Sequence, residues 1–194
     1  MKHLIIYANH NSESFNASIR DAAFETYKKS GHDTVVRDLY ELGFNPVLTV
    51  EDFQALQSGN LPQDIKIEQD YISWADQITF IYPVWWTGLP AILKGYIDRV
   101  FLYGFAYTVT ETGLKGLLGD KKVLIFSTTG QSKEVYDSLG MYDAMDKTTN
   151  LGIFGFCDMK VQKHIYFPSV LSVNDETRKL YIEQTVSVCN QFAD

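Results

Sequence analysis

Residues 76–101 read DQITFIYPVWWTGLPAILKGYIDRVF, and this run joins an apolar strand to a helix through an aromatic loop. Residues 76–83 form a short block rich in aliphatic and aromatic side chains, which is typical of a buried strand. After Pro90, apolar side chains return at helical spacing at Leu93 and Ile97. Proline fits the first position of a helix, because no backbone donor is needed there. The run therefore predicts a strand, a loop and a helix in succession.

The same alternation continues on both sides of this unit. The first apolar block of the chain ends at a polar loop and leads into a helix predicted from Phe15 to Gly31. No repeat or linker divides the sequence, so we expect a single domain over residues 1–194. Strands that alternate with helices predict a doubly wound, three-layer α/β sandwich with a five-stranded parallel sheet. The predicted strands are residues 4–8, 34–39, 76–83, 122–127 and 159–166.

Composition and charge disfavour several classes of function. The 194 residues carry 17 Lys and Arg against 24 Asp and Glu, and the net charge of −7 disfavours binding to nucleic acid or to anionic membrane surfaces. No apolar run reaches the roughly 20 residues that a membrane span needs, so we expect no membrane insertion. Cys157 and Cys189 show no metal-ligand spacing, so we expect buried thiols, no metal site and a cytoplasmic location.

Ligands of doubly wound sheets bind beyond the carboxyl ends of the strands, where the sequence places three loops. The first, residues 9–16, offers amide and hydroxyl donors at a helix N-terminus, which is the chemistry of a phosphate cradle. It contains no glycine, so neither a GxGxxG motif nor a Walker loop is present. Ser14 fits an ordinary helix cap equally well, and His10 taken alone fits an exposed loop residue better than a catalyst.

The second loop, residues 82–89, places Trp85 beside Trp86, and two successive side chains cannot both enter one face of the core. At least one indole is expected at the surface, either to stack on a planar heteroaromatic ring or to form an interface patch. The third loop, residues 127–136, can turn at Gly130 and offer backbone donors to a carbonyl edge. A plain strand-to-helix turn needs the same residue types.

Taken together, these segments resemble the NAD(P)H:quinone oxidoreductases related to DT-diaphorase, a flavodoxin-like family, over roughly the whole chain. The resemblance implies a flavodoxin-like fold, a tightly bound flavin, and ping-pong two-electron reduction of quinones by NADPH or NADH through that flavin. Azo and nitro compounds would be further acceptors. The most specific match is residues 82–101, followed by Gly104-Phe105-Ala106-Tyr107. Shorter matches are Ser14-Phe15-Asn16, Asp38-Leu39-Tyr40, Phe44-Asn45-Pro46, Glu68-Gln69 and Thr128-Thr129-Gly130.

The resemblance also implies which residues surround the flavin. Ser14, Phe15 and Asn16 would hold its phosphate and ribityl region, and Gln69 would reach the adenosine side of FAD. Backbone groups and rings of one loop would line the isoalloxazine, namely those of Pro83, Val84, Trp85, Trp86 and Thr87. The pyrimidine edge would be surrounded by Thr128, Thr129, Gly130 and Gln131.

Catalytic and substrate-binding residues follow from the same resemblance. Tyr136 would be a catalytic residue, with a hydrogen bond near the flavin O2 as charge builds at N1. Tyr107 would face the substrate, together with Trp86. Larger members of the family carry a histidine a few residues beyond the catalytic tyrosine, where this chain has Tyr142. We expect Tyr142 either as a substitute proton donor or as a plain loop tyrosine.

One departure from the family bears on the identity of the flavin. The family commonly has Tyr-Ala-His-Pro at the end of the first strand, whereas this chain has Tyr7-Ala8-Asn9-His10. Asn9 therefore takes the position of the phosphate-binding histidine, and it donates a hydrogen bond without charge assistance, which favours FMN. Gln69 and the long connection at residues 40–63 favour FAD. We expect FAD, with FMN as a close alternative.

The sequence leaves two other functions open. Relatives of this length act as flavin-binding ancillary subunits of a potassium-efflux transporter, and no sequence feature excludes that role. A non-enzymatic flavodoxin-type electron carrier normally has a phosphate loop rich in Thr, Ser and Gly, but residues 9–16 contain neither Thr nor Gly. The resemblance further implies a homodimer, and the aromatic stretch at residues 101–107 would suit its interface.

Overall fold

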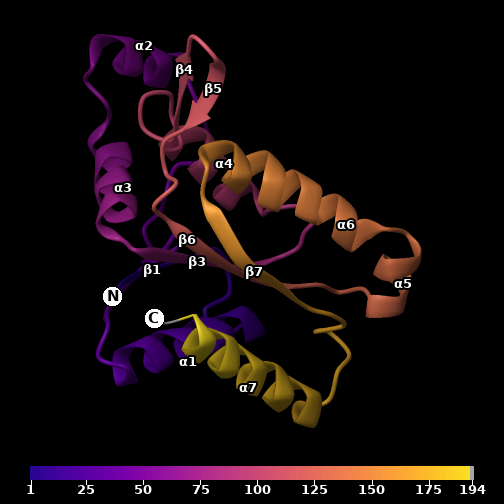
Figure 1. Cartoon of the computed structure of the whole chain (residues 1–194). Helices are drawn as coiled ribbons and strands as arrows, with labels where there is room; N and C mark the ends of the chain where they lie inside the picture. The colour runs from indigo at the N-terminus through magenta and orange to yellow at the C-terminus, as the bar shows by residue number, and fades with distance from the viewer. Residues whose placement is uncertain (193–194) are drawn as a thin grey trace.

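The computed structural model describes residues 1–192 and contains the predicted parallel sheet (Figure 1). Its five strands are hydrogen-bonded in the order β2-β1-β3-β6-β7. Figure 1 shows α1 and α7 on one face of the sheet and α3, α4 and α6 on the other, so the three-layer sandwich is confirmed. The sheet strands are β1 (Lys2–Tyr7), β2 (Asp33–Asp38), β3 (Gln77–Pro83), β6 (Lys122–Thr128) and β7 (Lys160–Phe167). The longer helices are α1 (Phe15–Lys29), α3 (Gln63–Trp74), α4 (Ala91–Val100) and α7 (Asp175–Gln191).

The two faces of the central strands bury different side chains. Leu4 and Ile6 belong to the core that α3 and α4 cover, whereas Ile5 and Tyr7 belong to the core that α1 and α7 cover. All four side chains are fully buried. A strand that is covered on both faces reads as a continuous apolar run, which is why the sequence marks these strands clearly.

The helix after the aromatic loop begins one residue later than the sequence predicts. Pro90 has an extended backbone (ψ 145°), so it lies at the cap position and Ala91 is the first helical residue. The Pro90 carbonyl accepts hydrogen bonds from the backbone amides of Leu93 and Lys94, each 2.9 Å long. The prediction that proline takes the first helical position was therefore wrong by one residue. Pro90 precedes the helix, and its own carbonyl accepts the first hydrogen bonds of the helix.

The long connection at residues 40–63 contains a helix that was not predicted, α2 (Val50–Ser58). Thr49 and Asp52 form a capping box at its start. The buried guanidinium of Arg99 on α4 contacts Asp52 at 2.9 Å and the carbonyl of Asn45 at 2.8 Å. This connection is therefore fastened to the α4 layer rather than left as a free loop.

Two further parts of the chain were not predicted. An antiparallel hairpin of β4 (Tyr107–Thr110) and β5 (Gly113–Gly116) forms a separate two-stranded sheet. Between β6 and β7 the chain passes through short helices, and one of them is a nine-residue π-helix, η1. These helices are α5 (Lys133–Ser138), α6 (Met141–Met145), η1 (Asp146–Phe154) and η2 (Gly155–Cys157).

Candidate active site

A cavity of about 470 Å³ opens at the carboxyl ends of β1, β3 and β6. All three predicted loops contribute to its wall, as does the segment that joins β7 to α7. The predicted cofactor-binding residues that line it are Asn9, Ser14, Phe15, Asn16, Pro83, Val84, Trp85, Thr128 and Gly130. The residues of the wall that were not assigned to the cofactor from the sequence are His10, Asn11, Val170, Leu171 and Arg178.

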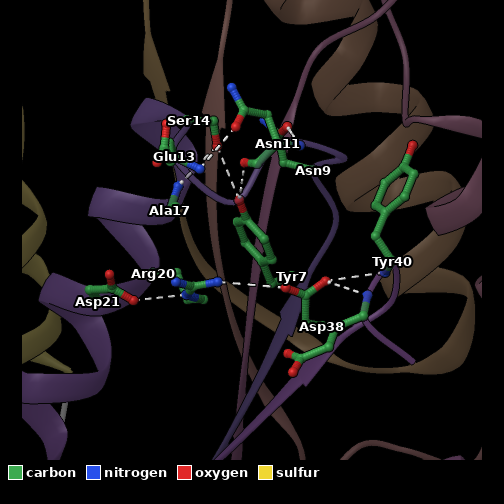
Figure 2. A network of polar contacts seen from close by, with 11 residues as sticks. Tyr7, Asn9, Asn11, Glu13, Ser14, Ala17, Arg20, Asp21, Asp38 and Tyr40 are labelled. Carbon is green, nitrogen blue, oxygen red and sulfur yellow. Dashed lines mark hydrogen bonds and ion pairs between the residues drawn. The ribbon is translucent and has the colours of Figure 1, made fainter. Parts of the chain in front are cut away.

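The first loop is held by a polar network around Tyr7 (Figure 2). The Tyr7 hydroxyl lies 3.0 Å from the Ser14 hydroxyl, which in turn accepts the backbone amide of Ala17 and so caps α1. Asn11 accepts the backbone amide of Glu13 at 2.9 Å. Burial raises the pKa of Tyr7, so its hydroxyl keeps its proton and remains a hydrogen-bonding group. Ser14 is thus both a helix cap and part of the cavity wall.

Asn9 and Asn16 share the floor of this loop. The Asn9 amide donates to Asn16 Oδ1 at 3.0 Å, and Asn9 Oδ1 accepts the backbone amide of Asn11. Asn16 Oδ1 also accepts the Thr128 hydroxyl at 3.0 Å. The Asn16 Nδ2 group is buried and has no hydrogen-bond partner among the described residues. A buried donor on a cavity wall without a partner points to an acceptor on a ligand or a water.

The second loop is a tight two-residue turn. Trp85 and Gly88 exchange two backbone hydrogen bonds of 3.1 Å, and between them Trp86 and Thr87 both have positive φ angles, 50° and 56°. Side chains with a Cβ are strained in this region, and such strain gathers at functional sites. Trp86 is fully exposed, which confirms that at least one indole lies at the surface. The Trp85 ring lies 5.6 Å from the His10 ring.

The third loop is tied to its neighbours through the backbone. The Val84 amide donates to the Thr128 carbonyl at 2.8 Å, and the Thr129 amide donates to the Phe167 carbonyl at 2.9 Å. A side chain at Gly130 would come within 3.5 Å of Leu171. This loop therefore lies close against the segment after β7, and its backbone forms one edge of the cavity.

The predicted catalytic residues lie just beyond this loop. Tyr136 in α5 is half-buried, and its ring packs edge-on against the Tyr142 ring with the centroids 5.4 Å apart. Burial raises the pKa of Tyr142, while the hydroxyl of Thr129 lowers it in part. The Tyr142 hydroxyl is buried and makes no well-formed hydrogen bond to a described residue. The structure thus brings the two tyrosines together beside the loop, although neither lines the 470 Å³ cavity.

Other predicted residues lie apart from the cavity. Gln69 donates its amide to the Val100 carbonyl at 2.9 Å and lines a separate cavity of about 440 Å³ with Lys66 and Phe105. The Tyr107 ring packs against Phe156, with the centroids 5.1 Å apart. The predicted residues outside the wall of the 470 Å³ cavity are Gln69, Trp86, Thr87, Tyr107, Thr129, Gln131, Tyr136 and Tyr142.

Arg178 is the cationic residue of the wall that the sequence did not predict. It lies in the second turn of α7, and its guanidinium donates to the Val170 carbonyl at 2.7 Å and sits 5.4 Å from the centre of the Phe15 ring. A guanidinium on this wall offers the positive charge that Asn9 lacks. No pattern near Arg178 in the sequence marks it, because its place on the wall depends on packing against Phe15, which is far away in the chain.

The chemistry of the wall suits an anionic group joined to a flat ring. The wall combines the free donor of Asn16, the guanidinium of Arg178 and the N-terminus of α1 with the Trp85 ring and the backbone of two loops. Within residues 1–192, no three His, Cys, Asp or Glu side chains gather as metal ligands would. A search of the same residues finds no helix with the length and apolar character of a membrane span.

Comparison with known proteins finds relatives along the whole chain. A family model described as flavodoxin-like fold matches residues 1–189. The chain is 39% identical to a Haemophilus influenzae protein named as an uncharacterized NAD(P)H oxidoreductase, over 94% of this chain and 91% of that protein. It is 36% identical to rat NAD(P)H dehydrogenase [quinone] 1, over 81% of this chain and 65% of the rat protein.

Solved structures show the same arrangement. An NAD(P)H:quinone oxidoreductase from Methanothermobacter marburgensis superposes with a TM-score of 0.89 at 27% identity, over 97% of both chains. A Streptococcus mutans protein superposes with a TM-score of 0.86 at 31% identity, over 99% of this chain and all of the other. A Bacillus anthracis FMN-dependent NADH-azoreductase, solved with FMN, has a TM-score of 0.79 at 17% identity over 100% of this chain and 99% of the other, which shows likeness of fold alone.

Proposed function

The chain belongs to the flavodoxin-like family that includes the NAD(P)H:quinone oxidoreductases and is an oxidoreductase, and from this membership we propose that it reduces quinones by two electrons at the expense of NADH or NADPH through a bound flavin. The reaction is ping-pong: the nicotinamide leaves before the quinone enters the same pocket. Azo and nitro compounds are further acceptors, because a flat exposed flavin reduces many of them.

The observation that carries this proposal is the wall of the 470 Å³ cavity. A buried amide without a partner at Asn16 and a guanidinium at Arg178 fit a flavin phosphate, while Trp85 and the strained turn fit the edge of a planar ring. A flavin bound there supplies the group that accepts and passes on a hydride. Gln69 lies in a separate cavity, so the wall supports the mononucleotide half, common to FAD and FMN, more directly than an adenosine subsite.

The residues around this cavity act by hydrogen bonding and proton transfer. The Tyr136 hydroxyl would donate a hydrogen bond to the pyrimidine edge of a bound flavin, where negative charge develops during reduction. The Tyr142 hydroxyl holds the proton that the quinone oxygen takes up, and its pKa, raised by burial, keeps it protonated at neutral pH. Trp86 and Tyr107 provide aromatic surface for the acceptor. Tyr107 lies away from the cavity within one chain, which fits a site that a second copy completes.

We infer a homodimer on that ground. The cytoplasmic location expected from the sequence stays part of the proposal. In the stretch at residues 101–107, Phe101, Leu102 and Ala106 are already buried in the core, whereas Tyr103 is exposed and available to a partner. Light scattering at micromolar concentration tests this directly, since a mass of twice 22.1 kDa is expected. A monomer at that concentration would remove the dimer and with it the shared site.

The test of the function begins with the absorption spectrum of the purified protein. Release of the chromophore by heat identifies FAD or FMN, and NADH or NADPH added without oxygen must bleach the bound flavin. Benzoquinone must then restore the colour. A flavin that is bound but not bleached favours the electron carrier or the ancillary subunit of a potassium-efflux transporter instead, and a colourless protein that takes up no flavin contradicts the proposal altogether.

A further inference from the structure

A partly buried polar cluster, with His164 at its centre and the half-exposed Asp146 at its edge, packs against Tyr142 and has no part in the reaction as proposed so far. Its members come from η1, β6 and β7. His164 Nε2 lies 2.9 Å from the Ser127 hydroxyl, and His164 Nδ1 lies 3.0 Å from Asn150 Oδ1. Both ring nitrogens are therefore held, and the imidazole is fixed in one orientation.

Asp146 connects this cluster to the tyrosines. Its Oδ1 accepts the Tyr166 hydroxyl at 2.9 Å and the Asn150 amide at 2.9 Å, and it lies 3.4 Å from His164 Nδ1. The Tyr166 ring stacks on the His164 ring with the centroids 4.0 Å apart, and its centroid lies 4.6 Å from that of Tyr142. The Tyr166 hydroxyl is thus bound by Asp146, and its ring packs against both His164 and Tyr142.

Two of the cluster's side chains come from the π-helix η1. Asp146 and Asn150 both lie in η1, and their side chains reach the same histidine on β7. π-helical turns are rare and are frequently found at functional sites. Since η1 follows α6 directly, Tyr142 in α6 and Asp146, which binds Tyr166, lie on consecutive helices with no loop between them.

The cluster is not a hydrolytic site, although Ser127, His164 and Asp146 follow the order of a catalytic triad. Ser127 is fully buried in the central strand β6, so no carbonyl substrate could approach its hydroxyl. The cluster can therefore act only on the residues that it contacts. Among these, Tyr142 packs against Tyr166 and lies beside the third loop.

We propose that Asp146, His164 and Tyr166 are positioning residues that fix the ring of Tyr142, the residue proposed above as the proton donor in quinone reduction. This inference rests on the proposed function. The Tyr142 hydroxyl interacts with the Thr129 hydroxyl without a well-formed hydrogen bond, so hydrogen bonding alone does not hold the ring in place. Ring packing against Tyr166 and Tyr136 does so instead.

The test compares Tyr166→Phe, Tyr142→Phe and the double variant in the purified protein. We expect each single change to slow reoxidation of the reduced flavin by benzoquinone about tenfold, with no further loss in the double variant, because both changes act on one donor. The KM for the quinone should stay near that of the unchanged protein. The matched control is Tyr27→Phe, which removes a buried hydroxyl bonded to Thr79 on the opposite face of the sheet and should leave the rate unchanged.

A second measurement does not depend on turnover. Carbon relaxation of the labelled tyrosine rings should show Tyr142 rigid in the unchanged protein and in Tyr27→Phe, and more mobile in Tyr166→Phe. Equal order of the Tyr142 ring in all three proteins would overturn the proposal, as would an additive loss of rate in the double variant. If NADH and NADPH fail to reduce the flavin of the unchanged protein, the proposed function falls, and the ring measurement alone then decides whether the cluster positions Tyr142.

Discussion

At the scale of single residues, the two polar atoms of the Asn16 side chain have different roles. Its Oδ1 accepts hydrogen bonds from Asn9 and Thr128, while its Nδ2 is left without a partner. Asn16→Asp keeps the shape and the acceptor but replaces the free donor with a second acceptor that carries charge. We expect flavin to bind about 10- to 100-fold more weakly, since a hydrogen bond to a charged group contributes roughly 1.5–3 kcal/mol.

Fluorescence titration of the released flavin against the flavin-free protein measures this loss. The control is Asn174→Asp, the same change at the cap of α7, where an aspartate can still accept the Thr177 amide. Flavin affinity that stays the same in Asn16→Asp would mean that the free donor faces water rather than the cofactor.

Tyr136 gives a prediction on rate rather than affinity. Tyr136→Phe removes one hydroxyl donor from the place where charge is expected to develop, and the ring that packs on Tyr142 remains. Hydride transfer from NADH to the flavin should slow by about 10- to 100-fold while the flavin stays bound. Stopped-flow bleaching of the flavin measures the step, and an unchanged rate would exclude Tyr136 from the reaction.

At the scale of elements, the connection at residues 40–63 depends on a close approach to α4. Gly95 faces Pro46, and an added Cβ would overlap the Pro46 carbonyl and ring. Gly95→Ala should therefore destabilise the protein by at least about 1–3 kcal/mol, although alanine favours helices. Urea unfolding gives the value. Gly88→Ala, where the nearest atoms lie at 3.9 Å, serves as the control, and equal stability of the two variants would contradict the close packing.

The elements also show what the sequence could and could not predict. The five sheet strands could be predicted because burial on both faces produces unbroken apolar runs. The three loops of the cavity wall could be predicted because ligands of such sheets bind beyond the carboxyl ends of the strands. The helix α2 was missed although Thr49 and Asp52 form a capping box, because a short and largely exposed helix has little apolar periodicity. Its attachment depends on Arg99, which is about 50 residues away. The place of Arg178 on the wall likewise depends on Phe15, a distant residue that no local pattern records.

At the scale of the whole molecule, the stability should depend on pH through His3. Burial, with His32 adding to it, lowers the pKa of His3 from 6.5 to about 4. Between pH 6.5 and 4 the unfolded chain binds a proton that the folded chain does not, so the folded state loses stability as the pH falls through this window. Asp52 has its pKa lowered by Arg99, so its contribution is lost only below about pH 3.8.

Urea midpoints measured from pH 7 to pH 4 test this dependence. His3→Phe keeps a ring to stack on Tyr27, whose centroid lies 3.9 Å from that of His3, and removes the titrating group. The variant should therefore show a flatter profile between pH 6.5 and 4. An identical slope in both proteins would assign the acid sensitivity to other groups.

The wall of the cavity brings together residues that lie far apart in the chain, Asn16 on α1 and Arg178 on α7. Ribosomes add roughly 5–20 residues per second, so the roughly 160 residues between these two take about 10–30 s to be made. During that time Asn16 has been made but Arg178 has not, so the wall lacks its guanidinium. A nascent chain can therefore complete this wall only after residue 178 has been made, so full cofactor binding has to wait until α7 is synthesised.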